Sequence, residues 1–268
     1  MKIADLIVED AGNYSDFVAY VMRVRSSIKK GQVSVHSKKY YIVGDVHGDI
    51  KTLSKIYRRI GEIGEDESIV FLGDYGDRGE YQIETWKTIA MTKLVLGKNA
   101  VTLRGNHEAL GNAIPYPHDI RYRLIEKFGE TDGDRAYNEL FLTFQELPVV
   151  MFGDKFIAMH GGFPVMDFHA DKIEDNIVEL LWNDPFEFLG YEPSPRGIGY
   201  LFGKDITEKW LSLTGSNFLI RGHEPCEGFM VNHDGLVYTV FSRTGKPYFN
   251  SKAAFGIIEN GNVNFELV

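Results

Sequence analysis

The chain has 268 residues, 44% of them hydrophobic and 25% charged, which is ordinary for a globular protein that buries a sizeable core. Its formal net charge of -9 excludes an overall basic field of the kind that gathers nucleic acid or binds an anionic membrane. The single cysteine, Cys226, excludes an intrachain disulfide and any site of several thiolates, so a metal would need histidine, aspartate or asparagine ligands.

The hydropathy of the sequence predicts neither secretion nor insertion into a membrane. The first residues do not form a signal peptide, and no stretch approaches the roughly 18 apolar residues that a spanning helix needs. We therefore expect a cytoplasmic protein with no membrane partner and no nucleic-acid partner.

Residues 1–38 predict a helical N-terminal extension. Ser15 can cap a helix that ends before Gly31, with Lys29 and Lys30 in its last turn. Its apolar residues recur at helical spacing, at Phe17, Val18, Val21, Val24 and Ile28. Four basic residues between positions 23 and 30 also allow a helix on a membrane surface, but such faces are usually just solvated, so a flanking helix is favoured.

Three times between residues 40 and 108, a short apolar run is followed by a polar turn. These pairs are 40–43 with 44–48, 69–72 with 73–79, and 100–104 with 105–108. Asp45, Asp74 and Asn106, one from each turn, are 29 and 32 positions apart, about the length of a strand plus a crossover helix. Residues 50–60 and 81–96 have the apolar spacing of such helices. We therefore expect parallel strands whose turns meet at one edge of a sheet.

Beyond residue 108 the pattern changes to a helical region and then to short strands. A break at residues 115–117 precedes helical spacing at 120–128 and 136–147. Strands are expected at 149–152, 156–159, 218–220, 236–241, 254–259 and 263–268, with hairpin turns at Gly153-Asp154 and Asn260-Gly261. We expect a second mixed sheet here. The prediction is thus one α/β domain over residues 1–268, with two mixed β-sheets packed as a sandwich and flanked by helices.

The polar residues that follow the predicted strands form a candidate site. They are Asp45, His47, Asp74, Asp77, Arg78, Asn106, His107, His160, Arg221 and His223. Oxygen and imidazole ligands suit divalent manganese, iron or zinc, and two such cations need a shared anionic ligand, a position that fits the central Asp74. Each short motif alone is more often a tight turn or a histidine satisfied by the backbone. Five of them, each after its own strand, favour one joint site.

These motifs closely resemble those of the PPP-type serine/threonine protein phosphatases, within the calcineurin-like metallophosphoesterase superfamily. The family's run of Gly-Asp-x-His-Gly, Gly-Asp-x-x-Asp-Arg-Gly, Gly-Asn-His-Glu, His-Gly-Gly and Arg-Gly-His occurs in order, starting at residues 44, 73, 105, 160 and 221. Stretches 147–149, 180–185 and 196–203 are also similar, and the resemblance extends from about residue 39 to the end.

The resemblance implies two divalent cations, manganese first, with iron or zinc as alternatives. Asp45, His47 and Asp74 would hold one cation, and Asp74, Asn106, His160 and His223 the other. A hydroxide bridging the two metals would then attack phosphoserine or phosphothreonine in protein substrates, without a covalent enzyme intermediate.

The same resemblance implies the remaining roles. Arg78 and Arg196 would bind the phosphoryl group, with Asn106 as a further substrate contact and Arg221 as the alternative arginine. His107, oriented by Asp77, would protonate the leaving oxygen.

The sequence departs from the family pattern at three places. Gly76 replaces a larger apolar residue, and Asn183 replaces a serine. Residues 242–248 replace the loop Ser-Ala-Pro-Asn-Tyr, which leaves the position of Tyr248 open.

Two alternative functions also stay open. One is a dinucleoside tetraphosphate hydrolase, which an aromatic pocket formed by Tyr75, Tyr116 or Phe229 would favour. The other is a phosphoprotein-binding module without turnover. The sequence does not identify regulatory subunits.

Overall fold

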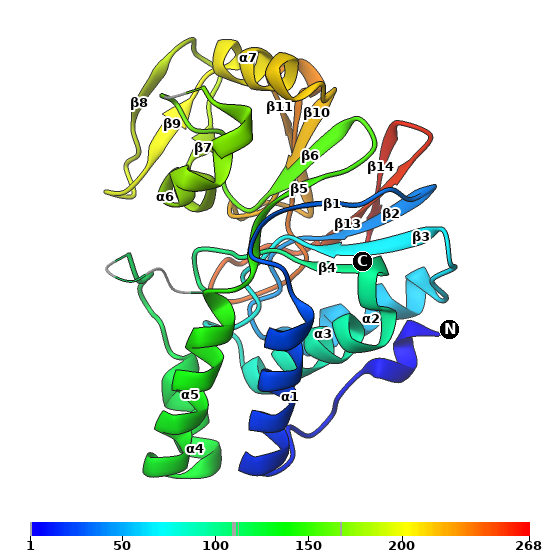
Figure 1. Ribbon diagram of the computed structural model, residues 1–268, viewed down its shortest axis with the longest axis vertical. Helices are drawn as coiled ribbons and strands as arrows, with labels where there is room; N and C mark the ends of the chain where they lie inside the picture. Colours follow the sequence, from blue (N-terminus) through cyan, green and yellow to red (C-terminus); the bar gives the residue numbers. More distant parts are fainter. Residues whose placement is uncertain (1, 109–110, 112, 167) are drawn as a thin grey trace.

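The computed structural model describes residues 2–108, 111, 113–166 and 168–268, which form two central β-sheets with helices outside them (Figure 1). The first sheet has the strand order β14-β13-β2-β3-β4. Its strands are β2 (Lys39–Val43), β3 (Glu67–Phe71), β4 (Ala100–Thr102), β13 (Ala254–Glu259) and β14 (Asn262–Leu267). As predicted, β2, β3 and β4 pair in parallel, so the turns that follow them leave the same edge.

The second sheet has the strand order β1-β5-β6-β10-β12-β11. Its strands are β1 (Gly31–Ser34), β5 (Pro148–Phe152), β6 (Phe156–Met159), β10 (Phe218–Arg221), β11 (Phe229–Asn232) and β12 (Val237–Val240). β5 and β6 form the hairpin predicted at Gly153-Asp154. β6 and β10 are parallel, so His160 and His223, which follow them, emerge at one edge.

The alternation of side chains along β2 explains why the two sheets form a sandwich. Tyr40 and Ile42 belong to the apolar layer between the sheets, where they meet Phe156 and Ile220 of the second sheet. Tyr41 and Val43 point to the opposite face and belong to the core beneath the helices. Both faces of β2 are buried, and the predicted fold class, two mixed sheets flanked by helices, is confirmed.

The helices form the two outer layers. Those packed with the outer face of the first sheet are α1 (Tyr14–Ser27), α2 (Ile50–Ile60), α3 (Gln82–Leu96), α4 (Ile120–Phe128) and α5 (Glu130–Phe144). Those beside the second sheet are α6 (Ile177–Trp182) and α7 (Lys204–Thr214), next to a small sheet of β7 (Asp184–Pro185), β8 (Tyr191–Pro193) and β9 (Tyr200–Phe202) (Figure 1). Short 3-10 helices are η1 (Ile3–Leu6), η2 (Gly97–Asn99), η3 (Ala170–Asn176) and η4 (His233–Gly235). Among the described residues, no helix is both long and apolar enough to cross a bilayer.

Two expectations about the sheets need correction. The hairpin of β13 and β14, with its turn at Asn260-Gly261, does not belong to the second sheet: β13 pairs antiparallel with β2 and extends the first. Strand periodicity reports which side chains are buried but not which sheet edge accepts the strand. The N-terminal region 1–38 is also not helical throughout, because β1 pairs in parallel with β5.

The bounds of two helices also differ from those expected. α1 begins two residues earlier, because Asn13 rather than Ser15 caps it, with its side chain accepting the backbone N–H of Asp16 at 3.0 Å. It ends at Ser27, since the backbone from Ile28 is extended and leads into β1. α5 begins at Glu130, well before the expected 136, and α4 is joined to it only by Gly129.

Candidate metal centre

The turns after β2, β3 and β10 hold several predicted site residues in an unusual backbone conformation. His47, Asp74, Asp77, Arg78 and His223 all have positive φ, between 43° and 72°. Residues other than glycine rarely adopt this region, and strained residues of this kind gather at functional sites. Close packing adds a constraint, because a Cβ at Gly105 would lie 2.2 Å from Asp74 Oδ1. The third turn therefore requires glycine beside Asp74.

The buried carboxylate of Glu108 joins the second turn to the third. It accepts hydrogen bonds from the backbone N–H groups of Asp74, Tyr75 and Gly105, at 2.7, 2.9 and 2.8 Å. These donors lie in the interior and need a partner there. Glu108 thus fixes the backbone of Asp74 relative to the turn that carries Asn106 and His107.

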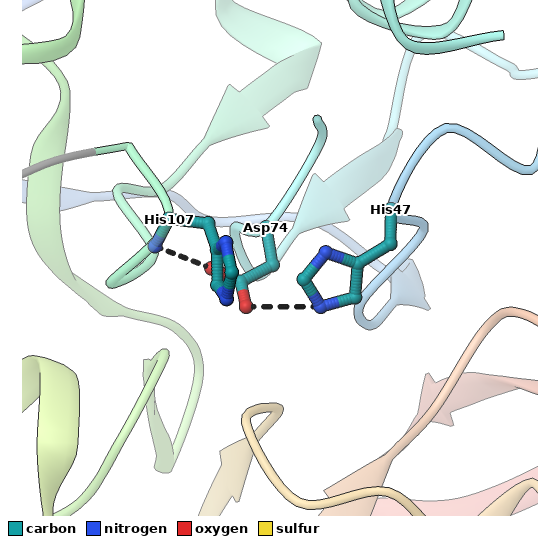
Figure 2. A group of neighbouring side chains, drawn as sticks. All are labelled: His47, Asp74 and His107. Atoms are coloured by element: carbon teal, nitrogen blue, oxygen red, sulfur yellow. Dashed lines mark hydrogen bonds and ion pairs between the residues drawn. The ribbon is translucent and has the colours of Figure 1, made fainter. Parts of the chain in front are cut away.

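Two imidazole rings approach Asp74, one at each carboxylate oxygen. His47 Nε2 lies 3.3 Å from Oδ2, and His160 Nε2 lies 3.3 Å from Oδ1 (the pair His47 and Asp74 is drawn in Figure 2). In both rings Nδ1 donates to a backbone carbonyl, that of Gly76 for His47 and that of Leu72 for His160. A neutral ring protonated at Nδ1 presents a lone pair at Nε2. Lone pairs therefore face carboxylate oxygens, an arrangement that a cation stabilises.

A second group of acceptors surrounds the side-chain amide of Asn106. Its Oδ1 lies 2.9 Å from His160 Nε2 and 3.1 Å from His223 Nδ1. If the amide is turned over, its nitrogen lies 3.2 Å from both Asp74 oxygens. His223 Nε2 is buried without a hydrogen-bond partner among the described residues. With two N–H groups, the turned-over amide can donate to only two of the four acceptors around it, whereas a cation among them would take the amide oxygen as a ligand.

Burial makes this cluster costly without a compensating positive charge. Desolvation, and then repulsion from Asp74, raises the pKa of Asp45 to about 7, and desolvation also raises the pKa of Asp74 to about 7. Burial lowers the pKa of His47, of His160 and of His223, so these rings are neutral at neutral pH. Neutral imidazoles beside carboxylates form a donor set for divalent cations, and the residues fit a metal centre.

Within the described part of the chain, two groups of side chains have ligand atoms close enough to share a cation. One is Asp74, His160 and His223, all members of the ligand set expected from the sequence. The other is His47, Asp74 and His107, drawn in Figure 2. Within each group the ligand atoms lie within 4.8 Å of one another. Asp74 belongs to both, which is the central position that the sequence pattern assigns to it.

His107 in the second group differs from the expected ligand, which is Asp45. Both nitrogens of His107 are engaged: Nδ1 lies 2.7 Å from Asp77 Oδ2, and Nε2 lies 3.3 Å from the Arg78 guanidinium. A cation at Nε2 would meet the positive charge of Arg78. Asp45 Oδ2 lies 3.8 Å from His47 Nε2 and brings a negative charge. The geometry therefore favours Asp45 as the ligand beside His47.

Asp77 orients His107 by a hydrogen bond to its Nδ1, and a second histidine, His118, bonds to the same carboxylate oxygen. His118 Nδ1 also lies 2.7 Å from Asp77 Oδ2, while Oδ1 accepts the backbone N–H groups of Asp119 and Ile120. Burial opposes ionisation of Asp77, but the hydrogen bonds from His107 and His118 hold its pKa below the ordinary value. Burial lowers the pKa of His107 to about 3, so its ring is neutral, with the proton on Nδ1 toward Asp77.

A cavity of about 570 Å³ opens in front of these residues. Its walls include His47, Asp74, Arg78, Asn106, His107, Tyr116, Trp182, Arg196, His223 and Tyr248. Arg78 and Arg196 therefore border the same space as Asp74. The side chain of Arg196, which is 34% exposed, is oriented by Asp184, whose Oδ2 accepts its Nε–H at 2.7 Å. Two guanidinium groups beside a metal centre provide an anion-binding wall.

Arg221, the alternative phosphate arginine, does not line this cavity. Its side chain is fully buried and donates to the carbonyl of Gly161, to Glu224 Oε2 and to Asp184 Oδ1. Since Asp184 also accepts from Arg196, Arg221 helps to position Arg196 through this shared carboxylate. Its guanidinium is already bound to protein acceptors.

Comparison with known proteins gives the family. The profile of the calcineurin-like phosphoesterases matches residues 38–227, which include all the motif residues from Asp45 to His223. The chain belongs to the calcineurin-like phosphoesterase family. Serine/threonine-protein phosphatase 5 of Arabidopsis thaliana is 33% identical over 77% of this chain and 40% of its own length. A probable serine/threonine-protein phosphatase of Encephalitozoon cuniculi is 30% identical over 77% of this chain and 47% of its own length. The chain thus spans less than half the length of these curated relatives.

The fold is also that of a solved phosphatase. A serine/threonine phosphatase from Saccharomyces cerevisiae superposes with a TM-score of 0.80, at 22% identity, over 96% of this chain and 90% of that one. This agreement extends to regions outside the profile, including the strands at the C-terminal end of this calcineurin-like phosphoesterase.

The departures from the family pattern have local explanations. A Cβ at Gly76 would lie 2.7 Å from Ile120 Cδ1, so α4 fills the space of a larger side chain. Asn183 donates to the carbonyl of Phe163 and accepts the N–H of Tyr200, which ties the segment after Arg196 to α6. Tyr248 lines the cavity although the loop before it differs, and its ring lies 5.6 Å from that of His47.

Three residues with a structural part in this phosphoesterase site were not identified from the sequence. Glu108 stands in the Gly-Asn-His-Glu motif, and Asp184 stands in a stretch similar to the family. The sequence pattern therefore contained both residues, but it did not indicate which hydrogen bonds they make. His118 follows the break at 115–117 and belongs to no motif. Only the folded chain brings it to Asp77.

Proposed function

We propose that this chain hydrolyses phosphoserine and phosphothreonine monoesters in proteins, with residues 1–268 acting as one catalytic domain. The observation that carries this proposal is the cavity in which Arg78, Arg196 and His107 border the Asp74 cluster. Membership of the calcineurin-like phosphoesterases and the names of the curated relatives support the substrate class.

We assign two divalent cations to the site, with manganese as the first candidate. Asp45, His47 and Asp74 would hold one, and Asp74, Asn106, His160 and His223 the other. Bound cations of this kind supply a water of lowered pKa as nucleophile and neutralise charge on the phosphoryl oxygens. These assignments are supported by the Nε2 lone pairs of His47 and His160, which face the carboxylate oxygens of Asp74. The His160 lone pair also faces the amide of Asn106. A cytoplasmic location agrees with the single cysteine.

The other residues of the cavity bind the substrate and move a proton. Arg78 and Arg196 would each present a fork of donors to the phosphoryl oxygens. The neutral His107 has its lone pair at Nε2, where it accepts a hydrogen bond from Arg78 beside the cavity. An entering phosphate dianion, together with Asp77, favours protonation of this nitrogen. His107 then gives the proton to the leaving oxygen.

The competing substrate, a dinucleoside tetraphosphate, finds less support. Of the three aromatic residues considered for a nucleotide pocket, only Tyr116 lines the cavity. Tyr75 is buried beneath the turns, where its hydroxyl donates to the carbonyl of Leu103. Phe229 stacks on Phe265 of β14.

The first experiment compares the two substrates directly. Metal-stripped protein is reloaded with manganese, and hydrolysis of a phosphothreonine peptide is compared with that of diadenosine tetraphosphate. We expect higher kcat/KM for the peptide. Preference for the dinucleotide would replace the substrate class, and turnover of neither would favour a phosphoprotein-binding module.

The second experiment tests the proton donor. The substitution His107→Asn should lower turnover by about 10² to 10⁴-fold and leave the manganese content unchanged. His36→Asn is the matched control, because His36 is exposed and precedes β2 at the other edge of the sheet. Unchanged turnover in His107→Asn would remove this residue from the mechanism.

A further inference from the structure

A second depression, of about 440 Å³, adjoins the metal cavity and is lined by basic side chains. Its cationic residues are Lys51, Lys55, Arg78, Arg243 and Lys246, and its carboxylates are Asp49 and Glu80. Since the whole chain carries a net charge of -9, this concentration of positive charge runs against the composition. We call the depression the basic groove.

One of its two carboxylates is occupied by the fold. Asp49 caps α2, and its side chain accepts the backbone N–H groups of Thr52 and Thr244, at 3.0 and 3.1 Å, and the hydroxyl of Thr52. These donors and the positive end of the helix dipole offset its charge. The cationic side chains of the groove outnumber its two carboxylates, so the groove keeps an excess of positive charge.

The loop after β12 builds one wall of the basic groove and is held firmly. Arg243 is buried, and it donates to the carbonyls of His47 and Lys246. Its guanidinium lies over the ring of Tyr248, 5.2 Å from the centroid. Lys246 is exposed on the same loop, and Lys51 and Lys55 are exposed on α2 across from it. Arg243 and Lys246 stand in the loop where this chain departs from the sequence of its family.

The basic groove is continuous with two neighbours. Arg78 lines both it and the metal cavity, so one guanidinium connects the proposed phosphate site to the groove. At the other end, Lys51, Lys55 and Tyr81 also line a third depression. It includes Arg58, the carboxylates of Glu9 and Glu84, and the apolar residues Ile7, Val8 and Ile50. A path therefore leads from the metal centre, across basic side chains, to a partly apolar end.

We propose that the basic groove binds acidic residues of the protein substrate that flank the phosphorylated residue. This inference rests on the proposed phosphatase function and adds a sequence preference to it. Carboxylate side chains of an extended peptide match the row of lysine and arginine groups, and a phosphate in the metal cavity places the flanking residues at Arg78. Because the protein as a whole is negatively charged, an acidic substrate should associate preferentially at this local positive site.

The test uses two phosphothreonine peptides of equal length, one with aspartate and glutamate flanking the phosphothreonine on both sides and one with alanine and glutamine there. Manganese-loaded protein should hydrolyse the acidic peptide with kcat/KM about tenfold higher, mainly through KM. The preference should shrink as ionic strength rises, because exposed charges are screened. In Lys55→Glu/Lys246→Glu the ratio of the two kcat/KM values should fall to about one or reverse.

The control is Lys98→Glu, which carries half the charge change of the double variant. Lys98 is exposed and precedes β4, at the edge of the first sheet away from the metal centre. The same kind of charge change there should leave the ratio of the two peptides as in the wild type. If the ratio of the two kcat/KM values falls equally in Lys98→Glu, the peptide preference depends on the net charge of the protein and not on the groove. That result would overturn the proposal.

A binding measurement separates this proposal from the proposed function. Fluorescence anisotropy of the labelled acidic peptide with metal-free protein measures binding of the peptide to the groove in the absence of hydrolysis. Absence of hydrolysis with retained, lysine-dependent binding would contradict the phosphatase assignment and support the groove. Equal affinity for the acidic and neutral peptides would overturn the groove, and tighter binding of single-stranded DNA than of the acidic peptide would assign the surface to nucleic acid instead.

Discussion

Asp77 and His118 are joined through Oδ2 and Nδ1 at 2.7 Å, the same distance at which that oxygen meets Nδ1 of His107. His118 is in turn fixed by the hydroxyl of Tyr137 on α5, 2.8 Å from its Nε2. The orientation of the proposed proton donor thus depends on the helical hairpin of α4 and α5. This dependence makes His118 a positioning residue rather than one that meets the substrate.

The substitution His118→Leu should weaken this support. Loss of a hydrogen bond to the ionised Asp77 is expected to cost about 1.5 to 3 kcal/mol of unfolding free energy and to lower kcat several-fold with little change in KM. His118→Asn is the matched variant, since its amide nitrogen can donate from near the Nδ1 position and should restore kcat. If His118→Leu raises KM and leaves kcat intact, the positioning role is wrong.

Glu108 should matter for stability more than its place in a metal-binding motif suggests. In Glu108→Gln, an amide nitrogen replaces one of the two oxygens that accept from Asp74, Tyr75 and Gly105, so at least one buried donor loses its partner. We expect a loss of about 2 to 4 kcal/mol, measured by urea unfolding of the metal-free protein. Glu65→Gln, on an exposed side chain, should stay within about 0.5 kcal/mol of the wild type. Equal stability of both variants would contradict the proposed role of Glu108.

The sequence predicted which turns meet better than it predicted the sheets. Asp45, Asp74 and Asn106 follow parallel strands at near-equal intervals, and parallel pairing leaves one arrangement for their turns, so their proximity followed from the order of elements. The hairpin of β13 and β14 was recognised from Asn260-Gly261, but its partner was not. Local periodicity determines that a strand forms, whereas the edge it joins depends on contacts between residues far apart in the chain.

The site residues that the pattern of strands and turns did not identify are also placed by contacts between distant parts of the chain. His118 reaches Asp77 across 41 positions, and nothing in the spacing of residues 113–119 predicts that contact. Arg196 was found only through resemblance, since no strand precedes it directly. In the structure, a hydrogen bond to Asp184 orients it. Residues on crossovers and loops are placed by tertiary packing, and a pattern of strands and turns does not determine their position.

Metal binding should depend on pH. Because burial raises the pKa of Asp45 and of Asp74 to about 7 in the metal-free protein, both carry protons below that pH and must release them to act as ligands. Manganese affinity should therefore be nearly constant above about pH 8 and should fall about tenfold or more per pH unit below about pH 6. Titration calorimetry in buffers of different ionisation enthalpy would measure both the affinity and the protons released at pH 6. Affinity that is constant down to pH 5, with no proton release, would refute this assignment of the two carboxylates.

Arg196 and Arg221 share the carboxylate of Asp184 but should respond to substitution in opposite ways. Arg196→Ala removes a solvent-accessible guanidinium from the cavity wall, so we expect near-native stability with kcat/KM for a phosphothreonine peptide lowered by about 10-fold or more. Arg221→Ala leaves the carboxylates of Asp184 and Glu224 without their buried partner and should cost about 3 to 5 kcal/mol. Melting temperatures together with kinetics of the two variants distinguish these roles. A stable Arg221→Ala with weakened phosphate binding would instead return Arg221 to the substrate site, because its charge would then act on the cavity rather than on the fold.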